Sequence, residues 1–151
     1  MRFFIGIIII LGAIQLIRPA KNISSGPQPN DITVKYHAPA DVTHLLHVAC
    51  YDCHSNNTRY PWYANIEPVG WYLANHVNSG KRHLNFSEIG AYPGKTAVNK
   101  LSHAVSQVRK HGMPLGSYLL LHPDARLTPA QIKLLSGWLE SVRESFPLSD
   151  R

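Results

Sequence analysis

The sequence predicts an all-α fold, in which a small helical domain follows an N-terminal hydrophobic helix. Two observations carry this prediction: apolar residues recur at helical spacing in the longer segments, and helix-capping residues stand at the ends of those segments. No alternation of apolar and polar residues predicts a strand. Residues 41–151 are enough for one domain with one hydrophobic core.

Residues 1–20 are predicted to be a signal anchor or a signal peptide. The run Phe3–Ile17 is almost entirely apolar and follows Arg2, which is the pattern of an export signal. It is shorter than the roughly 20 residues that usually span a bilayer, but it lies inside the tolerated range if the flanking residues snorkel. Because Arg18–Lys21 offers no pair of small residues for cleavage, we expect a retained anchor. A cleaved signal peptide is the alternative.

Residues 21–40 are predicted to form a flexible tether. They contain Pro27, Pro29, Pro39 and the run Ser24-Ser25-Gly26, with little apolar periodicity.

The domain at residues 41–151 is predicted to begin with a helix from Asp41, a good N-cap, to Cys50. Residues 55–66 are rich in Asn, Pro and aromatic residues and predict a loop. A second helix is expected to start at Pro68 and to reach about Gly80.

Two further helices are predicted with clearer signals. Residues 95–111 carry valine and leucine at helical spacing and end in basic residues before Gly112. The last helix has an N-cap at Thr128, a first-turn proline at Pro129 and a capping-box glutamine at Gln131.

The segment Cys50-Tyr51-Asp52-Cys53-His54 contains both cysteines of the chain in the spacing Cys-x-x-Cys-His, the attachment motif of c-type haem. Two thiols at this spacing can add to the two vinyl groups of one porphyrin. The histidine that follows can then bind the iron. The motif therefore predicts haem c, with Cys50 and Cys53 as thioether positions and His54 as the proximal iron ligand.

A structural zinc site and a dithiol pair share the first four positions of this motif. Zinc needs a closed set of four ligands, and the chain has no second pair of cysteines. A dithiol motif needs no histidine after it, and no βαβ pattern surrounds this one. Haem is favoured, and zinc or a plain structural pair is the alternative.

Met113 is predicted to be the distal iron ligand. It is the only methionine besides the initiator, and it lies between Gly112 and Pro114 just after a predicted helix. A histidine and a methionine together hold the iron in many cytochromes c. The alternatives are a methionine that fills a gap in the core, and His76 or His111 as the ligand.

Aromatic residues gather within about twenty residues of the motif. Tyr60, Trp62 and Trp71 are the candidate pocket residues among them, and ordinary core packing is the alternative role.

Several stretches of the chain resemble the bacterial haem-binding domain family, which is related to monohaem cytochromes c. These stretches are Cys50–Asn56, Thr58–Tyr63, Pro68–Trp71, Leu84–Ser87, Met113-Pro114 with Tyr118, and His122–Thr128. The resemblance implies a small cytochrome c-like helical domain wrapped around one covalently bound haem. It also implies thioethers at Cys50 and Cys53, with His54 as proximal and Met113 as distal ligand. The chain departs from the family at Ile89, where tryptophan is usual.

We therefore predict a monohaem c-type cytochrome that acts as an electron carrier by outer-sphere transfer and is not an enzyme. Covalent haem attachment takes place outside the bacterial cytoplasm. We thus expect the periplasmic side of the inner membrane, with an anchor at residues 3–17, or the soluble periplasm after cleavage. A haem-based gas or redox sensor and a peroxidase-like enzyme, each with a displaceable distal ligand, are the alternatives.

The formal net charge of +6 is concentrated in residues 80–111, which contain six Lys or Arg residues and one Glu. This pattern fits a solvated helix face or a docking surface for an acidic redox partner or for anionic lipid headgroups. Contact with the membrane is expected through the N-terminal segment. Nucleic acid is not an expected partner, because the chain has no recognition motif and carries an export signal.

Overall fold

The computed structural model describes residues 1–150, and it confirms the predicted all-α fold over that part of the chain. The α-helices are α1 (Arg2–Ile14), α2 (Ile32–Lys35), α3 (Ala40–Ala49), α4 (Tyr51–His54), α5 (Val69–His83), α6 (Gly94–Arg109), α7 (Gly116–Leu119) and α8 (Pro129–Glu144). The short 3₁₀ helices are η1 (Trp62–Asn65), η2 (Phe86–Ala91), η3 (Pro123–Ala125) and η4 (Leu148–Asp150). One isolated β-bridge joins Ile23 to Asn57.

Helix ends lie close to the predicted positions, with two differences. Helix α3 begins at Ala40 behind Pro39, and Asp41 lies inside its first turn, where its side chain accepts a hydrogen bond from the Val42 amide at 2.8 Å. Helix α5 continues past Gly80 to His83. The capping box at the start of α8 forms as predicted.

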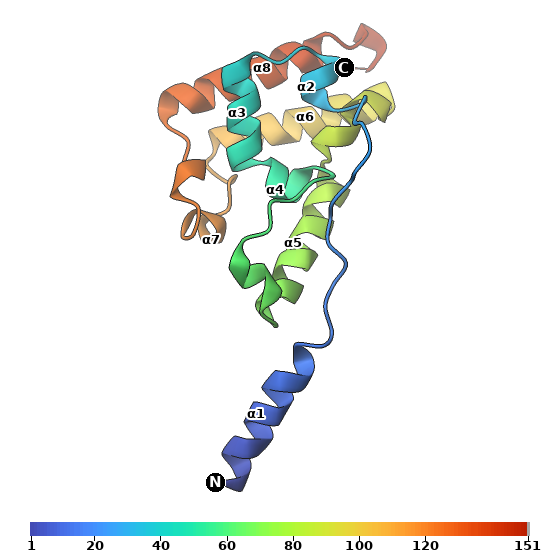
Figure 1. Ribbon diagram of the computed structural model, residues 1–151. Helices are drawn as coiled ribbons and strands as arrows, with labels where there is room; N and C mark the ends of the chain where they lie inside the picture. The colour runs from blue at the N-terminus through green and yellow to red at the C-terminus, as the bar shows by residue number, and fades with distance from the viewer. Residues whose placement is uncertain (151) are drawn as a thin grey trace.

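The core lies between α3, α6 and α8. Helices α6 and α8 pack side by side, and α3 crosses them at one end of the molecule (Figure 1). Leu101 of α6 and Leu135 of α8 are fully buried between these helices, and so is Leu46 of α3. Helix α4 contributes Tyr51 to this core and packs against α5.

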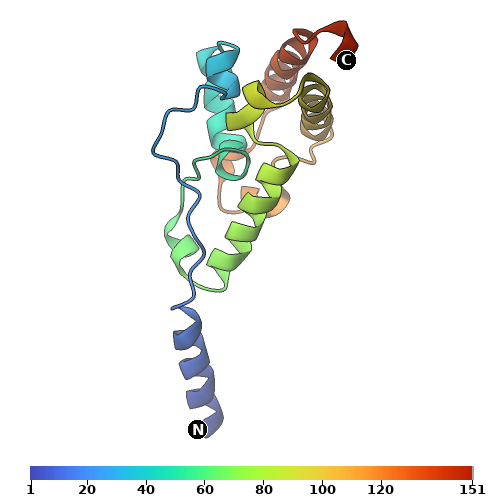
Figure 2. The ribbon, with the colours of Figure 1, turned by 90° about the vertical axis from the view of Figure 1, so that its right-hand side faces the viewer.

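Helix α1 projects from the opposite end of the molecule, beyond the start of α5 (Figures 1 and 2). Within the described residues 1–150, no helix has both the length and the apolar character needed to cross a membrane. The residues that follow α1 contact α5. The side-chain amide of Gln15 donates to the backbone carbonyl of Glu67, just before α5, at 3.1 Å. The oxygen of the same side chain accepts a hydrogen bond from the backbone amide of Glu67 at 2.9 Å. The Trp71 indole N–H donates to the Ile17 carbonyl at 2.7 Å.

Residues 21–40, which are predicted to be a flexible tether, make several contacts with the rest of the domain. The backbone amide of Asn22 donates to the Tyr60 hydroxyl at 2.8 Å. Further along, Asp31 is buried and accepts a hydrogen bond from the Tyr51 hydroxyl at 2.7 Å, and Ile32 is fully buried in the core. A buried isoleucine and a buried, hydrogen-bonded carboxylate hold this segment on the domain, although its composition is that of a linker.

Candidate functional site

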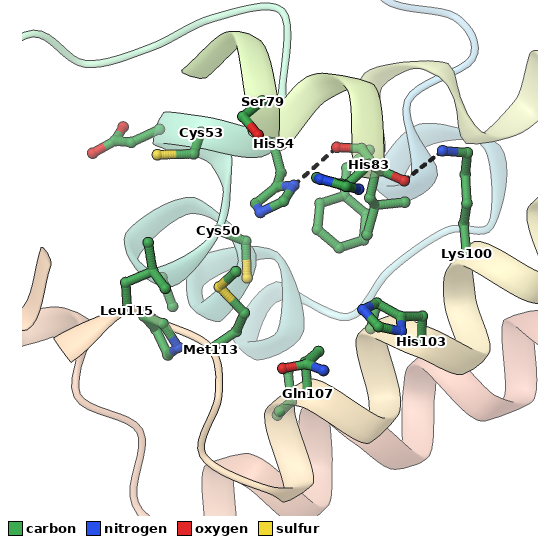
Figure 3. A pocket seen from close by; sticks show the side chains of 18 of the residues that line it. Cys50, Cys53, His54, Ser79, His83, Lys100, His103, Gln107, Met113 and Leu115 are labelled. Atoms are coloured by element: carbon green, nitrogen blue, oxygen red, sulfur yellow. Dashed lines mark hydrogen bonds between the residues drawn. The ribbon is translucent and has the colours of Figure 1, made fainter. Parts of the chain in front are cut away.

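A cavity of about 710 Å³ opens between α4, α5, α6 and the loop that follows α6 (Figure 3). This volume is in the range of sites that hold small molecules and cofactors. Its walls are largely apolar, with Ala49, Leu84, Phe86, Ala104, Val108, Pro114, Leu115 and Leu139 among the lining residues. The residues of the Cys-x-x-Cys-His motif that border it are Cys50, Asp52, Cys53 and His54.

Both cysteines are free thiols at the edge of this cavity. Cys50 forms the junction between α3 and α4, and Cys53 lies within α4. Burial, together with the neighbouring Cys53, raises the pKa of Cys50 to about 12. Burial and the Asp52 carboxylate raise the pKa of Cys53 to about 11. Both side chains are therefore uncharged thiols at neutral pH, and they are not paired in a disulfide.

His54 is held in one tautomer. Its Nδ1 lies 2.9 Å from the carbonyl oxygen of Leu84, the residue that ends α5. Because a carbonyl oxygen only accepts hydrogen bonds, Nδ1 carries the hydrogen and Nε2 keeps its lone pair. Burial lowers the pKa of His54, which favours the neutral ring. A neutral imidazole oriented by a backbone carbonyl is the usual state of a histidine that binds a metal.

Met113 reaches the same cavity from the loop after α6. The backbone amides of Gly112 and Met113 both donate to the Gln107 carbonyl, at 2.9 and 3.3 Å, which fixes the loop on the helix. Figure 3 shows the Met113 side chain directed into the cavity below His54. The structure thus brings together two thiols and one imidazole from the segment at α4 and one thioether from the loop after α6.

Of the two histidines predicted to compete with Met113, only His76 lines the cavity. Its Nδ1 lies 3.0 Å from the Tyr72 carbonyl oxygen one turn earlier in α5. His111 is exposed, adopts a positive φ of 56° just after α6, and is not part of the cavity wall.

The structure does not bring the three predicted pocket aromatics into the cavity. Tyr60 contacts Asn22, Trp62 is 75% exposed, and Trp71 contacts Ile17. The aromatic residues that line the cavity are Phe86 and Tyr118. Both lie in stretches that carry the family resemblance, and that was the available signal for them.

Asp52, between the two cysteines, fixes the motif to its surroundings. It is buried, and its carboxylate accepts hydrogen bonds from the Tyr118 hydroxyl at 2.7 Å and from the Arg59 amide at 3.1 Å. The Arg59 side chain forms an ion pair with it at 3.2 Å. Burial and this carboxylate raise the pKa of Tyr118, so its phenol stays protonated and donates. The loop before η1 and helix α7 are therefore joined to the motif through one side chain.

Several cavity residues were not identified from the sequence. His83, Lys100, His103 and Gln107 border the cavity from the end of α5 and from α6. Lys100 contributes to the basic character of residues 80–111, and no local pattern marked His83, His103 or Gln107 as cavity residues. The zinc alternative requires four ligands. Among the residues that the structure describes, no group of three or more His, Cys, Asp or Glu side chains is placed to hold a metal ion.

A family model described as a haem-binding domain matches residues 9–141 of the chain. No curated protein and no solved structure matches it.

Proposed function

This chain belongs to the haem-binding domain family, and we propose that it is a monohaem c-type cytochrome that transfers electrons in the periplasm. The observation that carries the proposal is the meeting of two free thiols, the Nε2 of His54 and the Met113 thioether at one largely apolar cavity. These donors are the set that a covalently attached, six-coordinate haem requires.

Each residue has a distinct part in this proposal. Cys50 and Cys53 would hold the porphyrin through thioether bonds, and His54 and Met113 would bind the iron. The Leu84 carbonyl orients the His54 ring and increases the basicity of its Nε2. The bound haem supplies one-electron redox chemistry. Because a methionine and a histidine together raise the reduction potential, the pair suits an electron carrier better than an enzyme with an open iron site.

Export is the second part of the proposal. The apolar run at residues 3–17 is the element that would direct the chain out of the cytoplasm, and covalent haem attachment requires that location. The test is to express the protein in a bacterial host that can export it to the periplasm. Mass spectrometry then shows whether residues 1–20 are retained as an anchor or removed.

The test is expression of the full chain together with a c-type haem maturation system. The expected product keeps its haem after acid denaturation and extraction with organic solvent. Its ferric form shows the weak far-red band of methionine-ligated haem. Cys50→Ser/Cys53→Ser is expected to lose all covalent haem. Covalent haem that persists in this double variant contradicts the proposal.

Carbon monoxide separates the electron carrier from the alternatives. We expect no binding to the reduced protein in the absence of denaturant, because Met113 occupies the sixth position. Rapid binding contradicts the carrier function and favours a gas sensor or a peroxidase-like enzyme with a displaceable ligand.

A further inference from the structure

We propose that the end of the cavity between the C-terminus of α5 and the middle of α6 is an anion site for the two carboxylate groups of haem, with Lys100 as its principal cation. This inference rests on the proposed function, because it assigns one edge of the same cofactor to one end of the same cavity. His83 and His103 border this end and would add N–H donors.

The two ends of the cavity differ in charge. Among the residues that the structure describes, Asp52 is the one acidic residue that lines the cavity, and it lies at the end where Cys53 and Tyr118 are found. Its charge is already satisfied by Arg59 and the Tyr118 hydroxyl. At the other end, Figure 3 shows Lys100, His83 and His103 on the far side of the cavity from Cys53.

Lys100 is fixed in place, and it forms no ion pair with any carboxylate in the part of the chain that the structure describes. Its ammonium group donates to the Arg82 carbonyl at 3.0 Å and also to the His83 carbonyl, so that it caps the end of α5. It lies 5.3 Å from the centroid of the Tyr92 ring. The two carbonyl groups are uncharged. The Tyr92 phenol is also uncharged, because burial raises its pKa. An ammonium group has three N–H donors, and two are used on carbonyls, which leaves one donor for an anion.

The chemistry of haem matches this asymmetry. Its two vinyl groups and its two propionate carboxylates lie on opposite sides of the porphyrin ring. When Cys50 and Cys53 hold the vinyl side, the carboxylates are directed away from the thiols. The cavity end away from Cys53 is where Lys100 lies. A carboxylate brought into a partly buried cavity needs a cation or strong donors to offset its loss of hydration.

The experiment compares haem with its dimethyl ester, in which both carboxylates are masked. The host is the full chain carrying Cys50→Ala/Cys53→Ala, so that binding is reversible and can be followed by absorption titration. We expect haem to bind at least about tenfold more tightly than the diester, the size of one or two charge-assisted hydrogen bonds. Adding Lys100→Gln is expected to remove most of that preference.

Lys95→Gln is the matched control. Lys95 lies on the same helix, is exposed, and does not line the cavity. It is expected to keep the full preference for haem over the diester. Equal binding of haem and diester in the parent, or an unchanged preference in Lys100→Gln, overturns the carboxylate site while haem binding itself stands.

A second measurement uses the covalently loaded chain with intact cysteines, and it applies even when the cysteine-free chain does not fold. The ionisation of ¹³C-labelled haem carboxylates is followed by infrared spectroscopy. Lys100→Gln is expected to raise the pKa of at least one carboxylate by about one unit, because an adjacent cation is lost. An unchanged carboxylate pKa contradicts the site. Failure of the wild-type chain to take up haem in either form contradicts the proposed function as well.

Discussion

Gly80 of α5 lies directly against the backbone of Cys53. A Cβ atom at position 80 would lie 2.5 Å from the Cys53 carbonyl oxygen and 3.1 Å from its carbonyl carbon. Helix α5 therefore packs on the attachment segment with no side chain between the two backbones. This close approach brings the end of α5 beside α4, where the Leu84 carbonyl contacts His54.

Gly80→Ala is expected to destabilise the fold by about 1–3 kcal/mol and to lower the yield of covalent haem, because the Cys53 backbone has to shift. Chemical denaturation and the ratio of haem to protein measure the two effects. Gly137→Ala is the control, since Gly137 is exposed in α8 and no atom lies within 4 Å of the position that an alanine methyl group would take. It is expected to be neutral or stabilising by up to about 1 kcal/mol. Equal stability and haem yield in the two variants contradicts the packing argument.

Tyr118→Phe is expected to lower the free energy of unfolding by about 1.5–3 kcal/mol, because the buried Asp52 carboxylate loses a charge-assisted hydrogen bond of 2.7 Å. Urea denaturation of the haem-loaded protein measures the change. Tyr72→Phe, at a residue that is 54% exposed, is expected to change stability by less than about 0.5 kcal/mol. A Tyr118→Phe protein as stable as Tyr72→Phe shows that Arg59 alone satisfies Asp52.

Ile32→Ala tests whether the segment after α1 is part of the core. Ile32 is fully buried, so its truncation is expected to cost about 2–5 kcal/mol. Val34→Ala, two residues later and 58% exposed, is expected to cost well under 1 kcal/mol. Similar, small effects in both variants are the result expected of a free tether, and they contradict the burial of Ile32.

Met113→Ala is expected to abolish the far-red band of the ferric protein, to lower the reduction potential and to open the iron to carbon monoxide. Absorption spectroscopy and potentiometry measure these changes. His111→Ala is the control and is expected to keep the band, because His111 lies outside the cavity. The competing assignment predicts that His76→Ala opens the iron to carbon monoxide while Met113→Ala does not.

The sequence was sufficient where the physical signal is local. Helices α6 and α8 have long apolar stripes, α8 also has a capping box, and the attachment motif is five consecutive residues. Ile32 gave no such signal, because one apolar side chain among polar neighbours has no period, and only the tertiary fold shows that it is buried.

The cavity wall could not be predicted for a related reason. Lys100 and Tyr118 are far apart in sequence and reach the same cavity only through the packing of α5, α6 and α7. The pocket aromatics were chosen by their closeness to the motif in sequence. Tyr60 and Trp71 instead contact the chain that follows α1, and no local pattern in the sequence indicates that contact.

The hydrogen bonds of Gln15, Ile17 and Asn22 also limit the distance between the cavity and α1. A flexible segment of twenty residues would have an end-to-end distance of roughly 25 Å. The domain could then take many positions relative to α1. Held along the side of the domain by these hydrogen bonds, the residues after α1 span a much shorter distance than a free segment would. The cavity therefore keeps a nearly fixed distance from α1.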